Sequence, residues 1–318
     1  MKDRLAVLLT ATLTFCLSVI GWAAPNHNTA TEDAKLFPGK LAALTRSGQL
    51  QLYSADRPAA GKRLKLQSPV PPQNYLSMAH GNIFDAQEGN ELLVLRNDGY
   101  VDVFPDPLLS SGNLRRIGYH SLQFPHGRKP AACAVGDFVA ETPGTELVVL
   151  VLGEEESPRS APAEFVYIYR PDAQKTIWKR KQYISLGISS RHLPHTAIAA
   201  WQRPGENDLL LAIGEDGYCE AFRLRQPKAI RLPDKSFPGA ALTPTAGLTC
   251  GEDSMLQLGR NNTLTAFALG GKSPRRAGAQ KLQTSDALID IALLESAPAA
   301  IRPSSRRASW KPALADDD

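Results

Sequence analysis

Continuous apolar runs alternate along this chain with segments in which apolar and polar residues are mixed. Leu92–Leu95, Leu147–Val151 and Leu209–Ile213 are uninterrupted apolar runs. Two of them are followed, after a short polar turn, by the mixed segments Tyr100–Phe104 and Tyr218–Phe222. An uninterrupted run is typical of a strand buried on both faces, and a mixed segment of a strand that is partly exposed. The pattern therefore predicts a series of antiparallel hairpins.

The predicted hairpin occurs five times, starting near residues 41, 91, 146, 208 and 254. Two of the turns are Asn97-Asp98-Gly99 and Glu215-Asp216-Gly217, whose residues tolerate the positive φ that tight hairpins require. Recurrence at a spacing of about fifty residues is the signature of a repeat architecture.

Each hairpin is flanked by two further strand-like segments. An apolar segment precedes the hairpin, as at Ala134–Phe138 and Ala197–Trp201. A more polar segment follows it, at 63–66, 114–120, 177–186, 229–232 and 281–282. The repeating unit is therefore a four-stranded antiparallel sheet of about fifty residues, which is the size of a propeller blade. The predicted fold class is all-β, a β-propeller.

The ends of the repeat region predict how the ring closes. The first copy lacks its innermost strand, and the chain has an unmatched apolar segment at Leu288–Leu294. If this segment completes the first blade, the ring has five blades and exposes no open sheet edge at its closure. Alternatively it begins a sixth blade, with 299–301 as the second strand; five blades are favoured slightly.

Two copies share a phrase beyond the strand pattern. In one, Gly136-Asp137-Phe138 precedes Pro143-Gly144-Thr145 and Glu146; in the other, Gly81-Asn82-Ile83 precedes Gly89-Asn90 and Glu91. These phrases resemble the FG-GAP/VCBS family of propeller repeats, in which G-D-[FIV] ends the innermost strand. The resemblance implies a propeller outside the cytoplasm. Integrin-type members bind Ca²⁺ in a D-x-D-x-D-G loop, but this chain has Gln87 and Gly89 at two of its positions and lacks the required oxygen ligands. We expect no metal and no cofactor.

An acidic residue opens the second strand of three copies, at Glu91, Glu146 and Asp208. A unique active site has no reason to repeat. We therefore interpret these carboxylates as acceptors for backbone N–H groups that fix the loop before the strand.

The N-terminus has the three parts of a secretory signal peptide. Lys2 and Arg4 precede an apolar run over 5–22, and small residues at Gly21 and Ala23 favour cleavage after Ala23. An uncleaved membrane anchor is the alternative. We predict a signal peptide over 1–23, a flexible segment over 24–38, the propeller over 39–302 and a disordered tail over 303–318. The protein is expected to be secreted or periplasmic, with no transmembrane segment after cleavage.

Charge and cysteine content add little to this interpretation. Without Lys2, Asp3 and Arg4, the chain has 34 basic and 31 acidic residues, which is too balanced to indicate nucleic-acid binding. Cys133, Cys219 and Cys250 match no metal-ligand spacing, and are typical of small buried residues. A Cys219–Cys250 disulfide is a possibility that an exported protein permits.

No catalytic motif is present. Of six histidines, only His192 and His195 are close in sequence, and no nearby carboxylate or thiol completes a metal site. His80 and His195 precede or lie in predicted inner strands, which makes them candidates for contact with a ligand at the channel or rim. Trp178 beside Lys179–Lys181 is either a polyanion-binding feature or a charged outer edge that prevents association.

The predicted function is therefore an exported non-catalytic propeller that binds a protein or glycan as a scaffold. The alternative is a propeller enzyme, a polysaccharide hydrolase or lyase with its active site in the central channel; this alternative rests on fold analogy.

Overall fold

The structure is a computed structural model. It describes residues 37, 39–54, 61–84, 89–125, 127–140, 144–153, 163–171, 178–187, 189, 191, 193–225, 227–238, 245–270 and 274–294. The predicted signal peptide and C-terminal tail lie outside these residues. No helix within the described ranges is long and apolar enough to cross a membrane.

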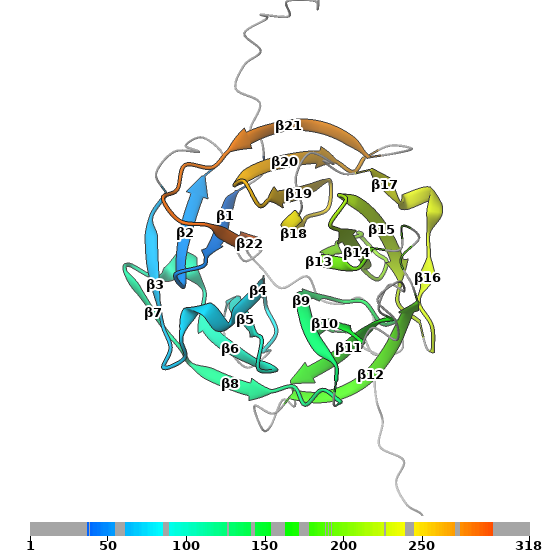
Figure 1. Ribbon diagram of the computed structural model, residues 1–318, viewed down its shortest axis with the longest axis horizontal. Coiled ribbons are helices and arrows are strands. Elements are labelled where there is room, and N and C mark those ends of the chain that lie inside the picture. Colours follow the sequence, from blue (N-terminus) through cyan, green and yellow to red (C-terminus); the bar gives the residue numbers. More distant parts are fainter. Residues whose placement is uncertain are drawn as a thin grey trace, which may run out of the picture. The chain divides into compact units, whose positions relative to one another are not determined.

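Five predominantly antiparallel sheets are arranged around one axis, so the fold is a five-bladed β-propeller (Figure 1). The five innermost strands are neighbours around the ring, in the order β22, β4, β9, β13, β18.

The strands of each blade are given from the axis outward. Blade 1 contains β22 (Leu288–Leu294), β1 (Lys40–Thr45), β2 (Gln49–Ser54), β3 (Arg63–Gln67) and β7 (Asn113–Arg115). Blade 2 contains β4 (Tyr75–Gly81), β5 (Glu91–Arg96), β6 (Tyr100–Pro105) and β8 (Gly118–Ser121). Blade 3 contains β9 (Lys129–Gly136), β10 (Glu146–Leu152), β11 (Glu164–Pro171) and β12 (Trp178–Gly187). Blade 4 contains β13 (His195–Trp201), β14 (Leu209–Gly214), β15 (Tyr218–Arg223), β16 (Ile230–Arg231) and β17 (Phe237–Pro238). Blade 5 contains β18 (Thr245–Cys250), β19 (Ser254–Gly259), β20 (Thr263–Ala268) and β21 (Arg275–Lys281). Three short 3₁₀ helices, η1 (Pro72–Asn74), η2 (Pro107–Leu109) and η3 (Pro233–Lys235), connect strands.

The C-terminal strand closes the ring, as the sequence predicts. β22 pairs antiparallel with β1, with Leu41 opposite Leu293 and Ala43 opposite Ile291. Blade 1 is thus built from both ends of the propeller chain. The five-blade prediction is confirmed, and the residues proposed for a sixth blade, 299–301, lie outside the described residues.

The core consists of five apolar clusters, one at each interface between neighbouring blades. Strand β5 illustrates why, because its side chains alternate in direction. Leu92 and Val94 pack toward blade 1, whereas Leu93 and Leu95 pack toward blade 3. A strand buried on both faces needs an uninterrupted apolar run, which explains the pattern in the sequence.

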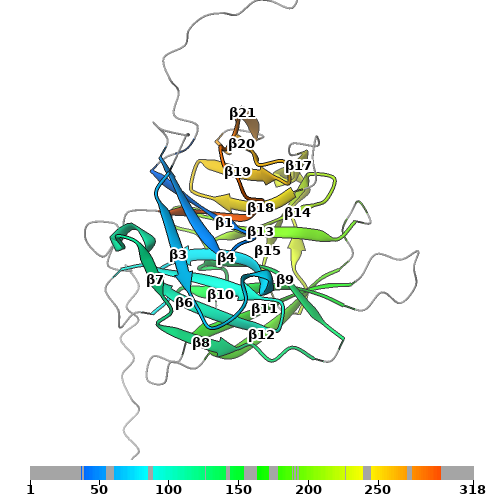
Figure 2. The ribbon, with the colours of Figure 1, turned by 60° about the vertical axis from the view of Figure 1, so that its left-hand side comes forward.

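Two details differ from the sequence prediction. The segment 114–120 was expected to form one outer strand, but it forms two, and β7 pairs in parallel with β3 of blade 1 (Figure 2). Gly112 accepts the N–H of Lys65 beside this junction, so the chain of blade 2 extends the neighbouring sheet. In addition, Phe37 lies in the predicted flexible segment but is 2% exposed in the core between blades 5 and 1.

Candidate functional site

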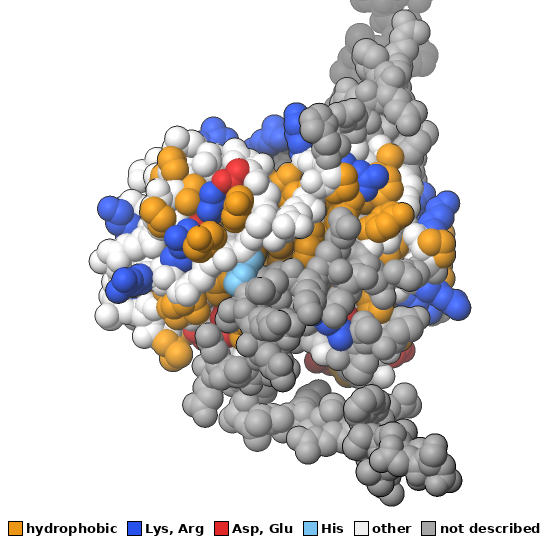
Figure 3. Space-filling view, turned by 90° about the horizontal axis from the view of Figure 1, so that it is seen from below, with side chains coloured by type: hydrophobic (Ala, Val, Ile, Leu, Met, Phe, Trp, Pro, Cys, Tyr) orange, Lys and Arg blue, Asp and Glu red, His pale blue; other side chains and the backbone are white. Residues whose placement is uncertain are grey.

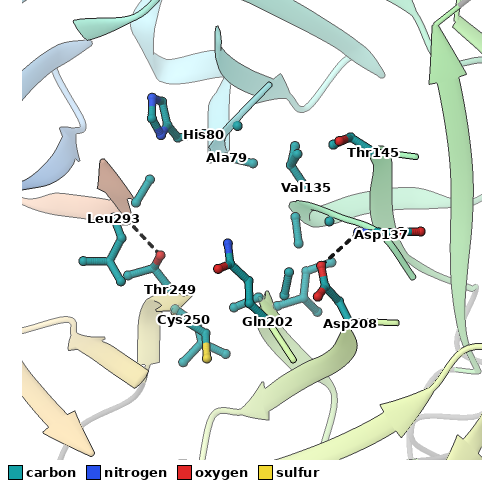
Figure 4. A pocket seen from close by; sticks show the side chains of 18 of the residues that line it. Ala79, His80, Val135, Asp137, Thr145, Gln202, Asp208, Thr249, Cys250 and Leu293 are labelled. Atoms are coloured by element: carbon teal, nitrogen blue, oxygen red, sulfur yellow. Dashed lines mark hydrogen bonds between the residues drawn. The ribbon is translucent and has the colours of Figure 1, made fainter. Parts of the chain in front are cut away.

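A cavity of about 420 Å³ lies on the axis of the ring. It is surrounded by the carboxyl-terminal halves of the five inner strands and by the loops that follow them. Ala79, Val135 and Leu293 are among the apolar residues that line it (Figure 4). The described part of the chain therefore forms a central cavity whose wall contains several small apolar side chains.

The mouth of this cavity is polar. Asn82, Thr145 and Gln202 line it from blades 2, 3 and 4, and Figure 4 shows the Gln202 amide extending toward its middle. Amides both donate and accept hydrogen bonds, and a hydroxyl does the same. Such a mouth can bind a ligand that also presents both kinds of group.

Two aspartates from different blades are linked at the mouth through backbone groups. The N–H of Asp137, after β9, donates to Oδ2 of Asp208, before β14, at 2.9 Å. The N–H of Asp208 donates back to the carbonyl of Asp137 at 2.8 Å. Asn207 Nδ2 donates to Asp137 Oδ1 at 3.3 Å. These contacts join blades 3 and 4 at the cavity.

Burial raises the pKa of Asp137, while the Gly144 N–H, the charge of Arg170 and the Asn207 amide act in the opposite direction. Gly136 makes the close approach possible, because a Cβ there would lie 2.7 Å from Asp208 Oδ2 and 2.8 Å from the Ala200 Cβ. Close packing therefore explains why glycine stands at position 136, in the Gly-Asp-Phe phrase.

The recurring acids accept backbone N–H groups, as predicted. Glu91 Oε2 accepts from Ile83 at 3.0 Å, and Glu146 Oε2 accepts from Phe138 at 2.8 Å. Both acids therefore hold the last residue of the repeat phrase in their own blade. Asp208 differs, because its bond reaches into the neighbouring blade.

His80 borders the cavity, but its side chain is only 2% exposed. Its Nε2 lies 3.6 Å from Oδ1 of Asp106, which also accepts the N–H of Leu108 at 2.8 Å. In Figure 4 the imidazole lies at the side of the cavity, apart from the Gln202 amide. His80 as a ligand contact stays a prediction.

His195 does not line the cavity; its side chain is 1% exposed between blades 3 and 4. Nδ1 lies 2.5 Å from Glu164 Oε2, and Nε2 lies 3.0 Å from Glu220 Oε2. Burial alone lowers the pKa of His195, but the hydrogen bonds and charges of the two glutamates outweigh it and raise the pKa to about 9. An imidazolium held in this way is a structural clamp between blades.

Sequence reasoning missed a repeated ion pair. Asp102 in β6 and Glu220 in β15 occupy matching positions on the third strands of their blades, and both are buried. Arg116 Nη1 lies 3.1 Å from Asp102, and Arg231 Nε lies 3.0 Å from Glu220. The sequence signal that could have revealed this pair is the acidic residue in the middle of Tyr100–Phe104 and of Tyr218–Phe222.

The structural role of Asp290 in β22 was also not predicted from the sequence. Its carboxylate accepts from Ser77 Oγ at 2.6 Å, from the Met78 N–H at 2.7 Å and from the Ile291 N–H at 2.8 Å. Ser77 Oγ in turn accepts the N–H of Cys133 at 3.1 Å. One carboxylate thereby links the inner strands of blades 1, 2 and 3.

Cys133, Cys219 and Cys250 are buried thiols, and Cys219 and Cys250 form no disulfide. Burial raises the pKa of the Cys133 thiol to about 12. In the ranges that the structure describes, no three His, Cys, Asp or Glu residues gather as metal ligands. His27, His126 and His192 lie outside these ranges.

A second hollow, of about 410 Å³, lies on the outer side of blade 2. Phe84, Ile117, Tyr119 and His120 are among its lining residues. The side chains of Trp178 and Lys179–Lys181 are not among those that the structure describes, so both interpretations of that segment stay predictions.

The arrangement of blades defines the protein as a five-bladed β-propeller. No protein-family model and no curated protein matches the sequence. Among solved structures, the chain is similar to BBS1N, which was crystallised in complex with ARL6DN and soaked with lead. Identity is 13% and the TM-score is 0.37, over 76% of this chain and 64% of that chain. The chain thus spans less than two thirds of that chain, and a likeness at this level says nothing about what it binds.

Proposed function

We propose that this protein is an exported, non-catalytic propeller that binds a segment of a protein or glycan at the mouth of its central cavity. The observation that carries the proposal is that, among the described residues, a charged pair is buried between blades whereas neutral polar groups face the cavity mouth. The buried pair of Glu164 and His195 holds blades 3 and 4 together, whereas the mouth presents Asn82, Thr145 and Gln202. Pockets that combine an apolar floor with a few polar groups are typical ligand sites.

The composition of the mouth favours a neutral ligand. Asp137, Asp208 and Glu252 line the cavity, and the Arg203 guanidinium lies 2.6 Å from Glu206. Because the nearby carboxylates repel anions, hydroxyl groups and peptide amides are the chemistry that this mouth accommodates best.

Photo-cross-linking from position 202 tests binding at the mouth. A photoreactive residue in place of Gln202, in the cell that produces the protein, is expected to give one reproducible adduct. The same residue in place of the exposed Arg276 on β21 is the control. Adducts that are equally frequent from both positions would contradict a site at the mouth.

Export is tested by isolating the protein from its native cell. We expect the mature chain outside the cytoplasm to begin at Ala24. A cytoplasmic protein that begins at Met1 would refute this part of the proposal.

The enzyme hypothesis has one observation in its favour, which is that Asp137 and Asp208 line the cavity from two different blades. Paired carboxylates at a channel mouth are what a glycoside hydrolase requires. If a polysaccharide were cleaved, Asp137→Asn and Asp208→Asn would each abolish turnover. We favour binding because both residues take part in the hydrogen bonds that join blades 3 and 4.

A further inference from the structure

The outer side of blades 1 and 2 carries a strip of one charge sign, formed by residues 61–67 and 107–121. These two segments contain Lys62, Arg63, Lys65 and Arg115, together with Arg116, which is paired with the buried Asp102, and they contain no Asp or Glu. The chain as a whole is nearly balanced, with 36 basic and 32 acidic residues. The strip is therefore a local concentration of positive charge.

The strip is continuous because β7 pairs with β3 and is followed directly along the chain by β8. Strand β3 pairs with β7, which places Lys65 beside Asn113 and Gln67 beside Arg115. Arg63, Lys65 and Arg115 are exposed on these strands. The Lys62 ammonium donates to the carbonyl of Ser110, just after η2. The Arg116 guanidinium lies 4.6 Å from the ring centre of Tyr119 in β8.

The same strip exposes large apolar side chains. Leu109 is 81% exposed, Ile117 is 51% exposed and Tyr119 is 57% exposed. In the described part of the chain only three other large apolar residues are exposed, Tyr183, Leu193 and Ile230. Figure 3, which views the side of the ring that holds β8 and β12, shows apolar side chains beside Lys and Arg, with an acidic side chain among them.

A charged edge that merely prevents strand association does not account for these apolar groups. Lys and Arg alone protect an exposed strand, and β21 illustrates this with Arg275, Arg276 and Lys281 exposed and no large apolar neighbour on the strand. Exposed apolar side chains within a basic surface are instead characteristic of proteins that bind anionic membranes.

We propose that this strip docks the propeller on a bilayer surface that carries anionic lipid headgroups. The cations bind the headgroups, and Leu109, Ile117 and Tyr119 enter the interfacial region. Strands β3, β7 and β8 lie on the outer edge of the ring (Figure 1). A fluid bilayer accepts exposed side chains there without matched shape. An acidic protein is the competing partner, and it would require an extensive complementary interface.

The test is flotation with vesicles of phosphatidylcholine, with or without phosphatidylglycerol. The mature chain from Ala24 is used, because it keeps all the described residues. We expect binding to the anionic vesicles, weak binding to the neutral vesicles, and release as salt concentration rises.

Two triple variants with the same change in net charge distinguish the strip from general attraction. Arg63→Glu, Lys65→Glu and Arg115→Glu together are expected to lower vesicle affinity by about 100-fold or more. The control, Arg275→Glu, Arg276→Glu and Lys281→Glu on β21, is expected to change it by less than about fivefold. Leu109→Ser with Ile117→Ser is expected to lower it by about tenfold or more at unchanged charge.

Each variant is checked for an unchanged thermal transition, so that loss of binding cannot arise from unfolding. Equal losses in the two triple variants would overturn the proposal, because attraction would then depend on total charge alone. Failure of the wild type to bind anionic vesicles would also overturn it and would favour an acidic protein partner. Neither result would bear on binding at the cavity mouth, which is tested separately.

Discussion

Asp290 combines complete burial with several hydrogen bonds. Burial raises its pKa to about 7, although the hydroxyl of Ser77 and the N–H groups of Met78, Ile291 and Leu248 favour the ionised form. The carboxyl of an unfolded chain has a pKa of about 3.9. The contribution of this group to the free energy of unfolding is therefore fully present below about pH 4, and is lost as pH rises through about 7.

We expect Asp290→Asn to flatten the dependence of stability on pH. Asn cannot ionise, so between pH 4 and pH 8 the wild type should lose about 4 kcal/mol more unfolding free energy than the variant. Urea denaturation at several pH values measures the difference. Asp286→Asn is the control of opposite sign, because hydrogen bonds from Ser47 lower the pKa of Asp286. Parallel curves for wild type and Asp290→Asn would refute the assignment.

The clamp at His195 makes a second prediction. Glu164→Ala leaves a buried imidazolium with one of its two acidic partners, and should cost about 3–5 kcal/mol of unfolding free energy. Replacing both Glu164 and His195 by Leu should cost less, because no unpaired charge remains. Since the folded pKa of about 9 exceeds the usual 6.5, the clamp stabilises fully below about pH 6.5 and is lost as pH rises through 9. A Glu164→Ala variant as stable as the wild type at pH 6 would contradict it.

The roles of single residues were harder to predict from the sequence than the strands or the fold. The role of Glu91 and Glu146 was predictable because the same residue type recurs at the same place in the repeat. His195 and Asp290 were not, because their partners lie 31 and more than 200 residues away in sequence. The one signal in the sequence was an acidic residue within an apolar strand, Leu288–Leu294, which indicates a buried carboxyl group.

At the scale of strands, the inner ring is packed too closely for side chains at some positions. A Cβ at Gly247 in β18 would lie 2.8 Å from the Cα of Asp290 and 2.9 Å from the Ile291 nitrogen, which are backbone atoms that cannot move aside alone. We expect Gly247→Ala to lower the unfolding free energy by about 1–3 kcal/mol. Gly270→Ala is the matched control, because nothing lies within 4 Å of its Cβ position. Equal stability of the two variants would show that the inner strands have more room than described.

The strands themselves were largely predictable. The second strands of the blades begin at residues 40, 91, 146, 209 and 254, close to the hairpin positions expected from the apolar runs. The split of 114–120 was not predictable, because β7 pairs with a strand nearly fifty residues earlier. Pairing of short polar outer strands leaves no apolar pattern in the sequence.

At the scale of the whole molecule, closure depends on β22. This strand contributes to two interblade cores through Leu294 and Ile291, and it carries Asp290. A chain that ends at residue 286 should therefore lack a cooperative thermal transition, whereas one that ends at residue 302 should keep the wild-type transition. Circular dichroism and limited proteolysis compare the two. A folded, protease-resistant chain without β22 would mean that the ring does not need its closing strand.

The cavity at the centre of the ring could not be predicted in detail, because its lining comes from five separate segments. The sequence predicted a channel, but His195 proved to be buried between blades, whereas Asn82, Thr145 and Gln202 reach the mouth. Asn82 and Gln202 directly follow inner strands, and Thr145 directly precedes a second strand. The repeat pattern alone does not show whether a loop at these positions binds a ligand or only connects two strands.

Photo-cross-linking from position 202 is the most direct test of binding without catalysis. We predict that it captures one partner, and that this partner, once purified, binds the wild type and is recovered chemically unchanged. Loss of binding in Asn82→Ala with Gln202→Ala, at an unchanged thermal transition, would locate the contact at the mouth. A partner that the wild type converts to product, with conversion abolished by Asp137→Asn, would contradict the account and identify an enzyme.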